Sequence, residues 1–303
     1  MNKDFLALLD WSLEDLESIF DLAKELKLKQ REGIPHQILK GQTLGMIFEK
    51  SSTRTRVSFE VGMFQLGGHA LFLHSGTTQM GRGEPIKDTA RVMSGYCDGV
   101  MARTYSHTAL EEFAENSYVP VINGLSDLYH PCQLVADMFT VTEHKENYRE
   151  LKYCWIGDGN NMANSWINAA AIAGFELRIA TPKGYEPDGD ILSLARSQGA
   201  NVILTHDPRE AAEGADVLNT DVWASMGHED EQEKRIKAFQ GFQINAELVK
   251  LANPDAVVMH CLPAHRDEEI TDEVVEGSQS IIFDEAENRL HVQKAILATL
   301  MAR

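Results

Sequence analysis

A dense group of hydroxyl and guanidinium side chains occurs early in the chain, at Ser51–Arg56. The group follows an apolar stretch that predicts a buried strand, and it precedes a helical pattern, so we expect it to begin a helix. Free amide groups and the helix dipole favour an anion at that point, and the planar guanidinium group matches phosphate oxygens. A helix cap with solvated arginines is the plainer alternative. The density of the cluster favours an anion site, without the GxxxxGK[ST] pattern of a P-loop.

Three polar residues further along occupy positions suited to an oxygen-rich substrate. Arg103 follows a short apolar stretch, and His130 and Gln133 flank Pro131 and Cys132 near the start of a helical pattern. At a spacing of three residues, the side chains of His130 and Gln133 can point the same way, one donating to an oxygen and the other accepting from an amide. Taken alone, Arg103 would be a surface charge and His130 a core or capping histidine. Together, the three residues favour a binding site for such a substrate.

The segment Gly157-Asp158-Gly159, after another predicted strand, resembles the start of a dinucleotide-binding turn. The third glycine is missing, because Met162 stands in its place, and the next strand ends at Thr181 without the acid that would hold a ribose. A nicotinamide-dependent dehydrogenase is therefore a weak alternative. The asparagines of this turn offer donors and acceptors that suit the charged end of an amino acid.

Two later segments also follow predicted strands, where the clefts of α/β proteins form: Asp221–Gly227, of the form DxxxSMG, and His260–Ala264, HCLPA. An aspartate can pair with an ammonium group. A neighbouring carboxylate such as Asp221 would keep the Cys261 thiol protonated, which argues against a cysteine nucleophile. A mobile glycine loop and a small buried hydrophobic residue are the plainer interpretations.

Phe48–Glu60 (FEKSSTRTRVSFE), Met101-Ala102-Arg103 and His130–Gln133 (HPCQ) resemble, in the expected order, the carbamoyl-phosphate motifs of the aspartate/ornithine carbamoyltransferase family. The DxxxSMG and HCLPA segments are similar to those of members that act on ornithine. The resemblance covers essentially the whole chain. Ser51 stands where many members have proline, a small departure because its neighbours keep the hydroxyl and arginine pattern.

The resemblance implies transfer of the carbamoyl group of carbamoyl phosphate to the side-chain amine of L-ornithine, giving L-citrulline and phosphate. It implies no metal and no organic cofactor. Arg56 is expected to point away and to form a structural salt bridge. Catalytic roles fall to Arg103, His130, Asp221 and Cys261; carbamoyl phosphate would contact Ser52, Thr53, Arg54, Thr55, Gln79, Arg103, His130, Gln133, Cys261, Leu262 and Arg289, and ornithine would contact Asn161, Asp221, Ser225 and Met226.

Several alternatives stay open within this resemblance. The amine could instead be putrescine or an N-acylated ornithine, or the chain could be a binding-only relative, although the residues such a relative would lose are all present. The family suggests a homotrimer or an assembly of trimers, with Gln79 reaching a neighbouring subunit's substrate. The sequence does not distinguish arginine synthesis from arginine breakdown.

Composition limits the classes of protein to which the chain can belong. Its 303 residues are 43% hydrophobic and 24% charged, enough for about two globular domains. With 46 acidic and 28 basic residues the net charge is −18, which disfavours sequence-independent binding to nucleic acid or to anionic membranes. The start of the chain lacks a signal-peptide pattern, and the four cysteines form no CxxC pair. We therefore expect a cytoplasmic protein without zinc or a disulfide framework.

The elements that must position these residues alternate between continuous apolar runs and helical periodicity, the pattern of parallel sheets covered on both faces. We predict an α/β fold with two domains, each a parallel sheet flanked by helices, and an active site in the cleft between them. The polar segment His144–Glu150 is the expected boundary. It separates a carbamoyl-phosphate domain, 1–143 with the returning helix 288–303, from an ornithine domain, 150–287. Strands are predicted at 43–49, 70–73, 99–102, 119–122, 151–156, 176–180, 201–205, 216–219, 256–260 and 280–283, and helices at 13–28, 56–66, 86–96, 109–116, 131–143, 163–173, 191–198, 229–239 and 292–301.

Overall fold

The computed structural model describes residues 3–77, 83–224 and 231–302. Its contacts divide the chain into two compact units, the first comprising Met1–Ala136 and Glu287–Arg303, and the second Asp137–Ala286. Both divisions fall inside helices, α5 and α12, so each of these helices contributes residues to both units.

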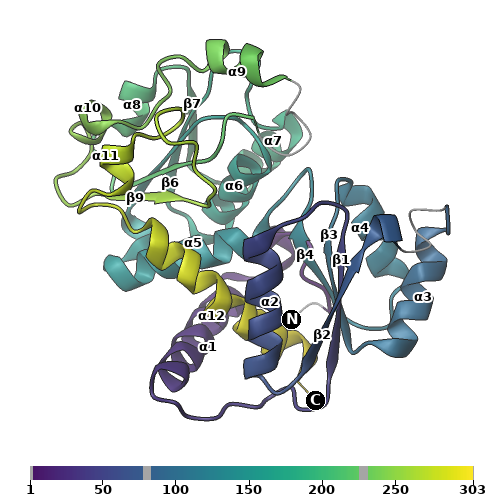
Figure 1. Cartoon of the computed structure of the whole chain (residues 1–303). Coiled ribbons are helices and arrows are strands. Elements are labelled where there is room, and N and C mark those ends of the chain that lie inside the picture. Colours follow the sequence, from purple (N-terminus) through teal and green to yellow (C-terminus); the bar gives the residue numbers. More distant parts are fainter. Residues whose placement is uncertain (1–2, 78–82, 225–230, 303) are drawn as a thin grey trace. The chain divides into compact units, whose positions relative to one another are not determined.

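The first unit contains a parallel sheet of four strands in the order β2-β1-β3-β4. Helices α1 and α2 lie on one face of the sheet, and α3 and α4 cover the other (Figure 1). At the carboxyl edge Phe48 pairs with His74 on one side and with Arg103 on the other. The elements are α1 (Leu13–Arg31), β1 (Thr43–Phe48), α2 (Thr53–Gln65), β2 (His69–His74), α3 (Ile86–Tyr96), β3 (Gly99–Arg103), α4 (His107–Asn116), β4 (Val121–Leu125) and the start of α5 (Pro131–His144), with short 3-10 turns η1 (Leu8–Asp10) and η2 (Ser75–Thr77).

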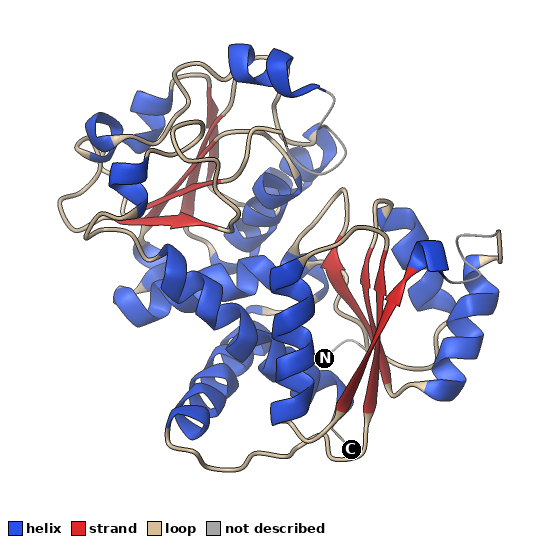
Figure 2. Cartoon of the chain, in the orientation of Figure 1, coloured by secondary structure: helices blue, strands red, loops and turns tan. Residues whose placement is uncertain are grey.

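The second unit contains a parallel sheet of five strands in the order β7-β6-β5-β8-β9, again a single layer between helices (Figure 2). The core on one face is built from alanines of α8, Leu248 of α10, and Val274 and Val275 of α11. The elements are η4 (Tyr148–Glu150), β5 (Lys152–Ile156), α6 (Asn161–Ala173), β6 (Glu176–Ala180), α7 (Gly189–Ser197), β7 (Val202–Thr205), α8 (Pro208–Ala212), β8 (Val217–Thr220), α9 (Gln232–Ala238), α10 (Ala246–Val249), β9 (Val257–His260), α11 (Asp272–Val275) and the first residues of α12 (Ile282–Met301).

These two sheets confirm the predicted fold class, but one predicted strand is wrong. Ser280 makes only an isolated bridge to Val258, and the chain enters α12 at Ile282. The last helix therefore begins ten residues before the expected start, and Arg289 lies inside it. The apolar period was hidden because Glu285 and Asn288, both 0% exposed, occupy its buried positions. The short helices α8, α10 and α11 have four or five residues each, too few to give a periodic signal.

Two further findings concern the predictions made from composition. In the parts of the chain that the structure describes, no helix combines the length and the apolar character needed to cross a membrane. Cys97, Cys132, Cys154 and Cys261 are all buried free thiols.

Candidate active site

The Ser51–Arg56 cluster provides the N-cap and the first turn of α2, shortly after β1. Ser52 has extended backbone (φ −153°) and caps the helix, because its hydroxyl accepts the amide of Thr55 at 3.4 Å. The helix begins three residues before the predicted start, so the backbone amides of the motif itself form the N-terminus of α2. Ser52 and Arg54 are half-buried and Thr53 is exposed. This end of a 13-residue helix provides a positive dipole end beside a guanidinium group, which suits a phosphate.

Arg289 of α12 connects this turn to the start of α5. Its Nη2 donates to Thr55 Oγ1 at 2.7 Å, and its Nη1 donates to Gln133 Oε1 at 2.6 Å. All three residues are buried. The contact fixes which end of the Gln133 amide carries the oxygen, and a carbonyl oxygen has a second lone pair for a substrate N–H. Arg289 therefore positions two predicted contact residues at once.

His130 and Arg103 complete the predicted set in the first unit. His130 is 4% exposed and precedes α5, where its carbonyl accepts the amides of Gln133 and Leu134. Burial, together with the charges of Arg289 and Arg103, holds the pKa of His130 well below its usual range. Its imidazole is therefore neutral at neutral pH. Arg103 ends β3, and its carbonyl accepts the Glu49 amide at 2.9 Å.

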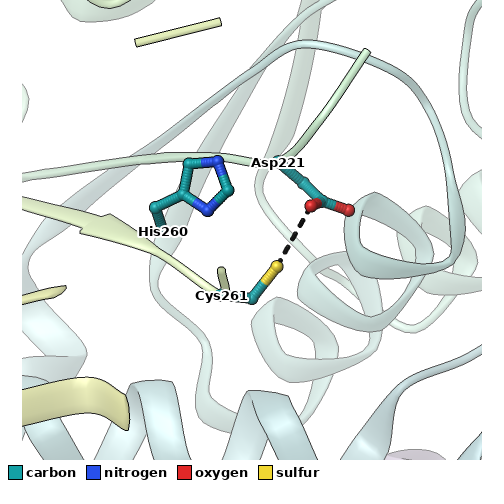
Figure 3. Close-up of side chains that lie close together, drawn as sticks. All are labelled: Asp221, His260 and Cys261. Carbon is teal, nitrogen blue, oxygen red and sulfur yellow. Dashed lines mark hydrogen bonds between the residues drawn. The ribbon is translucent and has the colours of Figure 1, made fainter. Parts of the chain in front are cut away.

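In the second unit, Asp221 and Cys261 follow the neighbouring strands β8 and β9, and Figure 3 shows the Cys261 thiol directed at the Asp221 carboxylate. Cys261 Sγ donates to Asp221 Oδ1 at 3.2 Å, and that oxygen also accepts the Val222 amide at 2.8 Å. The other oxygen, Oδ2, accepts Asn160 Nδ2 at 3.0 Å. Three donors therefore fix the orientation of the carboxylate.

The Cys261 thiol is held in its protonated form. Burial raises its pKa well above the usual value, and the nearby carboxylates of Asp221, Glu285 and Asp137 raise it further. The thiolate is the nucleophilic form of cysteine, so this environment suits a hydrogen-bond donor rather than a nucleophile. The sequence argument for a neutral thiol is confirmed.

The segment after Cys261 has an unusual backbone. Leu262 has φ +57°, in the left-handed region that a branched side chain rarely adopts, and the Leu262-Pro263 peptide is cis. The Leu262 amide donates to His260 Nδ1 at 2.9 Å, while His260 Nε2 lies 2.9 Å from Glu269 Oε1. Both ring nitrogens of His260 therefore have a partner, and Nδ1 acts as an acceptor. A non-glycine residue in the left-handed region, such as Leu262, often occurs at a functional site.

The space beside the turn that follows β5 is occupied by another segment of the chain. A Cβ on Gly159 would lie 2.2 Å from the Pro187 nitrogen, and the Gly159 amide donates to Tyr185 O. The Asn160 side chain caps α6 by accepting the amides of Met162 and Ala163. The close approach and the helix N-terminus that a dinucleotide phosphate would use are therefore both occupied, which argues against the dehydrogenase alternative.

An ion pair absent from the sequence-based predictions fixes α9. Arg235 Nη1 donates to Asp158 Oδ2 at 2.7 Å and to Trp223 O at 2.9 Å, and its guanidinium lies 5.1 Å from the Tyr185 ring centre. Asp158 and Arg235 are both buried. Burial raises the pKa of Asp158 to about 6, against the opposing charge and hydrogen bond of Arg235. Because the partners are 77 positions apart, no local motif could have revealed the pair.

The remaining predicted residues either lie outside the part of the chain that the structure describes or lie apart from the contacts given above. Gln79, Ser225 and Met226 lie outside the described residues. Asn161 is half-buried in the first turn of α6, beside the capping residue Asn160 that the sequence-based prediction had omitted. Arg56 pairs with Glu60 at 2.9 Å and stacks on the Phe72 ring at 3.8 Å, so its predicted salt bridge is observed.

Fold and site together define a two-domain α/β protein that combines an arginine-rich anion site with a second site rich in amide and carboxylate groups. Two family models match it in sequence. The carbamoyl-P binding domain of aspartate/ornithine carbamoyltransferase matches residues 3–143, and the Asp/Orn binding domain matches residues 149–300. The chain belongs to the aspartate/ornithine carbamoyltransferase family, as the sequence motifs had indicated.

Individual relatives agree with this assignment over the whole length. An ornithine carbamoyltransferase of Syntrophotalea carbinolica is 69% identical over 302 residues, and the match covers 100% of both chains. The structure of the ornithine carbamoyltransferase from Pyrococcus furiosus is 51% identical, with a TM-score of 0.94 over 98% of this chain and 96% of that one. The anabolic enzyme from Campylobacter jejuni is 47% identical, with a TM-score of 0.93 over 99% of each chain.

Proposed function

We propose that this chain transfers the carbamoyl group of carbamoyl phosphate to the side-chain amine of L-ornithine, giving L-citrulline and phosphate. The proposal is supported by full-length similarity to ornithine carbamoyltransferases at up to 69% identity. The observation that carries it is the anion site at the start of α2, tied through Arg289 to Gln133. This network joins Thr55, a proposed phosphate contact, to Gln133, the proposed contact of the carbamoyl amino group.

The first turn of α2 binds the phosphate group in this proposal. The hydroxyls of Ser52, Thr53 and Thr55, the backbone amides and the Arg54 guanidinium group hold its oxygens. Negative charge grows on the phosphate as it leaves. Because these dipoles are already oriented before the reaction, they stabilise that charge without rearrangement.

The carbamoyl group itself contacts Arg103, His130 and Gln133. The Arg103 guanidinium and the neutral His130 imidazole donate to its oxygen and polarise the carbonyl. Gln133 Oε1, held by Arg289 at 2.6 Å, accepts from the carbamoyl amino group. Loss of one such donor typically lowers the rate by about 10²–10³-fold.

Ornithine binds in the second unit, with Asn161, Ser225 and Met226 holding the amino acid. The side-chain ammonium has a pKa near ~10 and must lose a proton before it attacks the carbamoyl carbon. The oriented Asp221 carboxylate receives the ammonium group, and Cys261 holds that carboxylate as a neutral donor at 3.2 Å. Cys261 and Leu262 also contact carbamoyl phosphate, so this segment serves both substrates.

We further propose that the chain assembles as a homotrimer. Helix α2 exposes Val57, Val61 and Phe64 at helical spacing, and Phe64 is 80% exposed. Such an apolar stripe is typical of a subunit interface.

The free thiols fit a location in the reducing cytoplasm. Arginine biosynthesis is the favoured role, since the Campylobacter jejuni relative is described as anabolic.

A panel of amines tests the proposed reaction. Product formation from carbamoyl phosphate would be measured with L-ornithine, putrescine, N-acetylornithine, lysine and aspartate, using the Arg54→Ala protein as the control. We expect citrulline from ornithine alone, and a loss of about 10²-fold or more in the control. Turnover of a different amine would overturn the roles of Asp221, Ser225 and Met226. Folded protein without any turnover would instead support a binding-only relative.

A further inference from the structure

A second group of ionisable side chains lies on the turn that follows the Cys261–Ala264 segment, outside the residues proposed to bind substrate. His265 Nδ1, one oxygen of Glu268 and one of Glu269 all lie within 4.8 Å of one another. His265 Nδ1 is 3.8 Å from Glu268 Oε2 and 4.0 Å from Glu269 Oε2. One imidazole and two carboxylates thus converge on a small volume.

Glu269 directs a buried carboxylate oxygen into this volume. The side chain is 0% exposed, and its Oε1 accepts the His265 amide at 2.6 Å and lies 2.9 Å from His260 Nε2. Its Oε2 is also buried but has no hydrogen-bond partner among the described residues, and it faces His265 Nδ1. A separation of 4.0 Å is too long for a hydrogen bond. Because an unsatisfied buried polar atom is costly, the geometry points to a missing partner.

The backbone of the turn that carries these side chains is held by hydrogen bonds from Gln243 and Ile244 and by one within the turn. Gln243 Nε2 donates to two successive carbonyls, Asp267 O at 2.8 Å and Glu268 O at 2.9 Å. The Glu268 amide donates to His265 O at 2.9 Å. The Ile244 amide donates to Glu269 O at 2.8 Å. Glu269 is therefore fixed in place before any ligand arrives.

We propose that His265, Glu268 and Glu269 bind a divalent transition-metal ion, with Zn²⁺ as the best match. One imidazole nitrogen and two carboxylate oxygens are ligands that Zn²⁺ accepts at about 2.0–2.2 Å, with water completing the site. Glu269 supplies the fixed ligand. The side chains of His265 and Glu268 are 44% and 34% exposed, so they are free to close on the ion and leave a path for its entry.

A second cluster of possible ligands among the described residues is Asp221, His260 and Cys261. There, both ring nitrogens of His260 are already used, one by the Leu262 amide and the other by Glu269. Burial and nearby carboxylates raise the pKa of the Cys261 thiol, so a metal ion would have to displace its proton. The proposed site has neither obstacle. None of its three residues is proposed to contact a substrate of the carbamoyl transfer.

Calorimetric titration with Zn²⁺ tests the site in full-length protein stripped of metal by a chelator. A Cys261→Ser background removes the thiol as a competing ligand, and circular dichroism checks that each variant is folded. His265→Gln and Glu268→Gln each remove one ligand without touching the contact between Glu269 and His260. His206→Gln is the matched control, because His206 is 40% exposed and lies 3.7 Å from a single carboxylate, that of Glu186.

We expect one saturable Zn²⁺ site in the Cys261→Ser protein and in the His206→Gln control. His265→Gln or Glu268→Gln should weaken it at least about tenfold, because partners that merely orient metal ligands already contribute about 10–100-fold. With Co²⁺ as the probe, the site should show no sulfur-to-metal charge-transfer band. Absence of binding, or binding that depends on Cys261 and ignores His265→Gln, would overturn the proposal.

Discussion

At the scale of single residues, hydrogen-bond donors and protonation states decide what the candidate site can do. Cys261 and His130 are two groups that often exchange protons in enzymes, yet the structure holds the thiol protonated and the imidazole neutral. Each can therefore act through a hydrogen bond. The sequence predicted the neutral thiol from its aspartate neighbour alone, because that argument needed only proximity to Asp221.

If Cys261 acts only as a donor to Asp221, a hydroxyl should replace it. We expect Cys261→Ser to keep kcat/KM for ornithine within about tenfold of the wild type, because the serine hydroxyl can still donate to the Asp221 carboxylate, and a hydrogen bond to a charged group contributes about 1.5–3 kcal/mol. Cys261→Ala, which leaves Asp221 without that donor, should lose more. Steady-state kinetics would measure both variants. Complete loss of activity in Cys261→Ser alongside a correctly folded protein would argue for thiolate chemistry instead.

At the scale of elements, the strands were predicted best and the helix ends least well. Continuous apolar runs identified nine strands of the two sheets because parallel strands are buried on both faces. The start of α12 was missed because Glu285 and Asn288 replace apolar residues on its buried side. Asn160 and Arg235 were missed as site residues because their roles depend on contacts with Asp221 and Asp158, which are distant in sequence.

The Asp158–Arg235 ion pair should make ornithine binding sensitive to pH. Arg235 also bonds Trp223 O, so the pair fixes chain positions on either side of the predicted ornithine residues Ser225 and Met226. Below pH about 6 Asp158 is protonated and the charge pairing is lost. We expect KM for ornithine to rise about tenfold as the pH falls through this value. In Asp158→Asn, KM should be high throughout and lack this transition.

The pH dependence of folding stability should have the opposite sign. Protonation of Asp158 weakens ornithine binding but favours the folded state. The folded-state pKa of about 6 lies above the usual 3.8, so between these values the folded chain binds a proton that the unfolded chain has lost. This group's contribution to the free energy of unfolding is therefore greatest below pH 4 and declines as the pH rises to 6. Denaturant titrations of wild type and Asp158→Asn would measure it. A wild-type advantage that grew with pH would contradict the assignment.

At the scale of the whole molecule, the residues of the proposed site are divided between the two units. The proposed phosphate and carbonyl contacts belong to the first unit, and Asp221, the proposed partner of the ammonium group, belongs to the second. The sequence motifs assign the two substrates to the two domains in this order, and that assignment stays a prediction. The oligomeric state is a property of surface side chains, such as Phe64, that follow no motif.

The proposed trimer predicts a specific effect of charge on α2. Phe64→Glu, alone or with Val61→Glu, should convert the trimer to smaller species, because a carboxylate would be buried in an apolar interface. Light scattering after size-exclusion chromatography would measure the mass. Phe283→Glu is the matched control, since Phe283 is also an exposed aromatic residue on a helix, 58% accessible. A trimer that survives the α2 changes would place the interface elsewhere.

The tight turn at Gly159 sets a limit for protein engineering. Restoring the missing glycine by Met162→Gly would give the chain a better match to a nucleotide-binding consensus, but the space opposite Gly159 would still be filled by the backbone at Glu186 and Pro187. A designer who wanted to graft a new cofactor onto this scaffold would have to rebuild the β6–α7 connection first. A variant chosen only for its match to the consensus would still have this space blocked to a phosphate group.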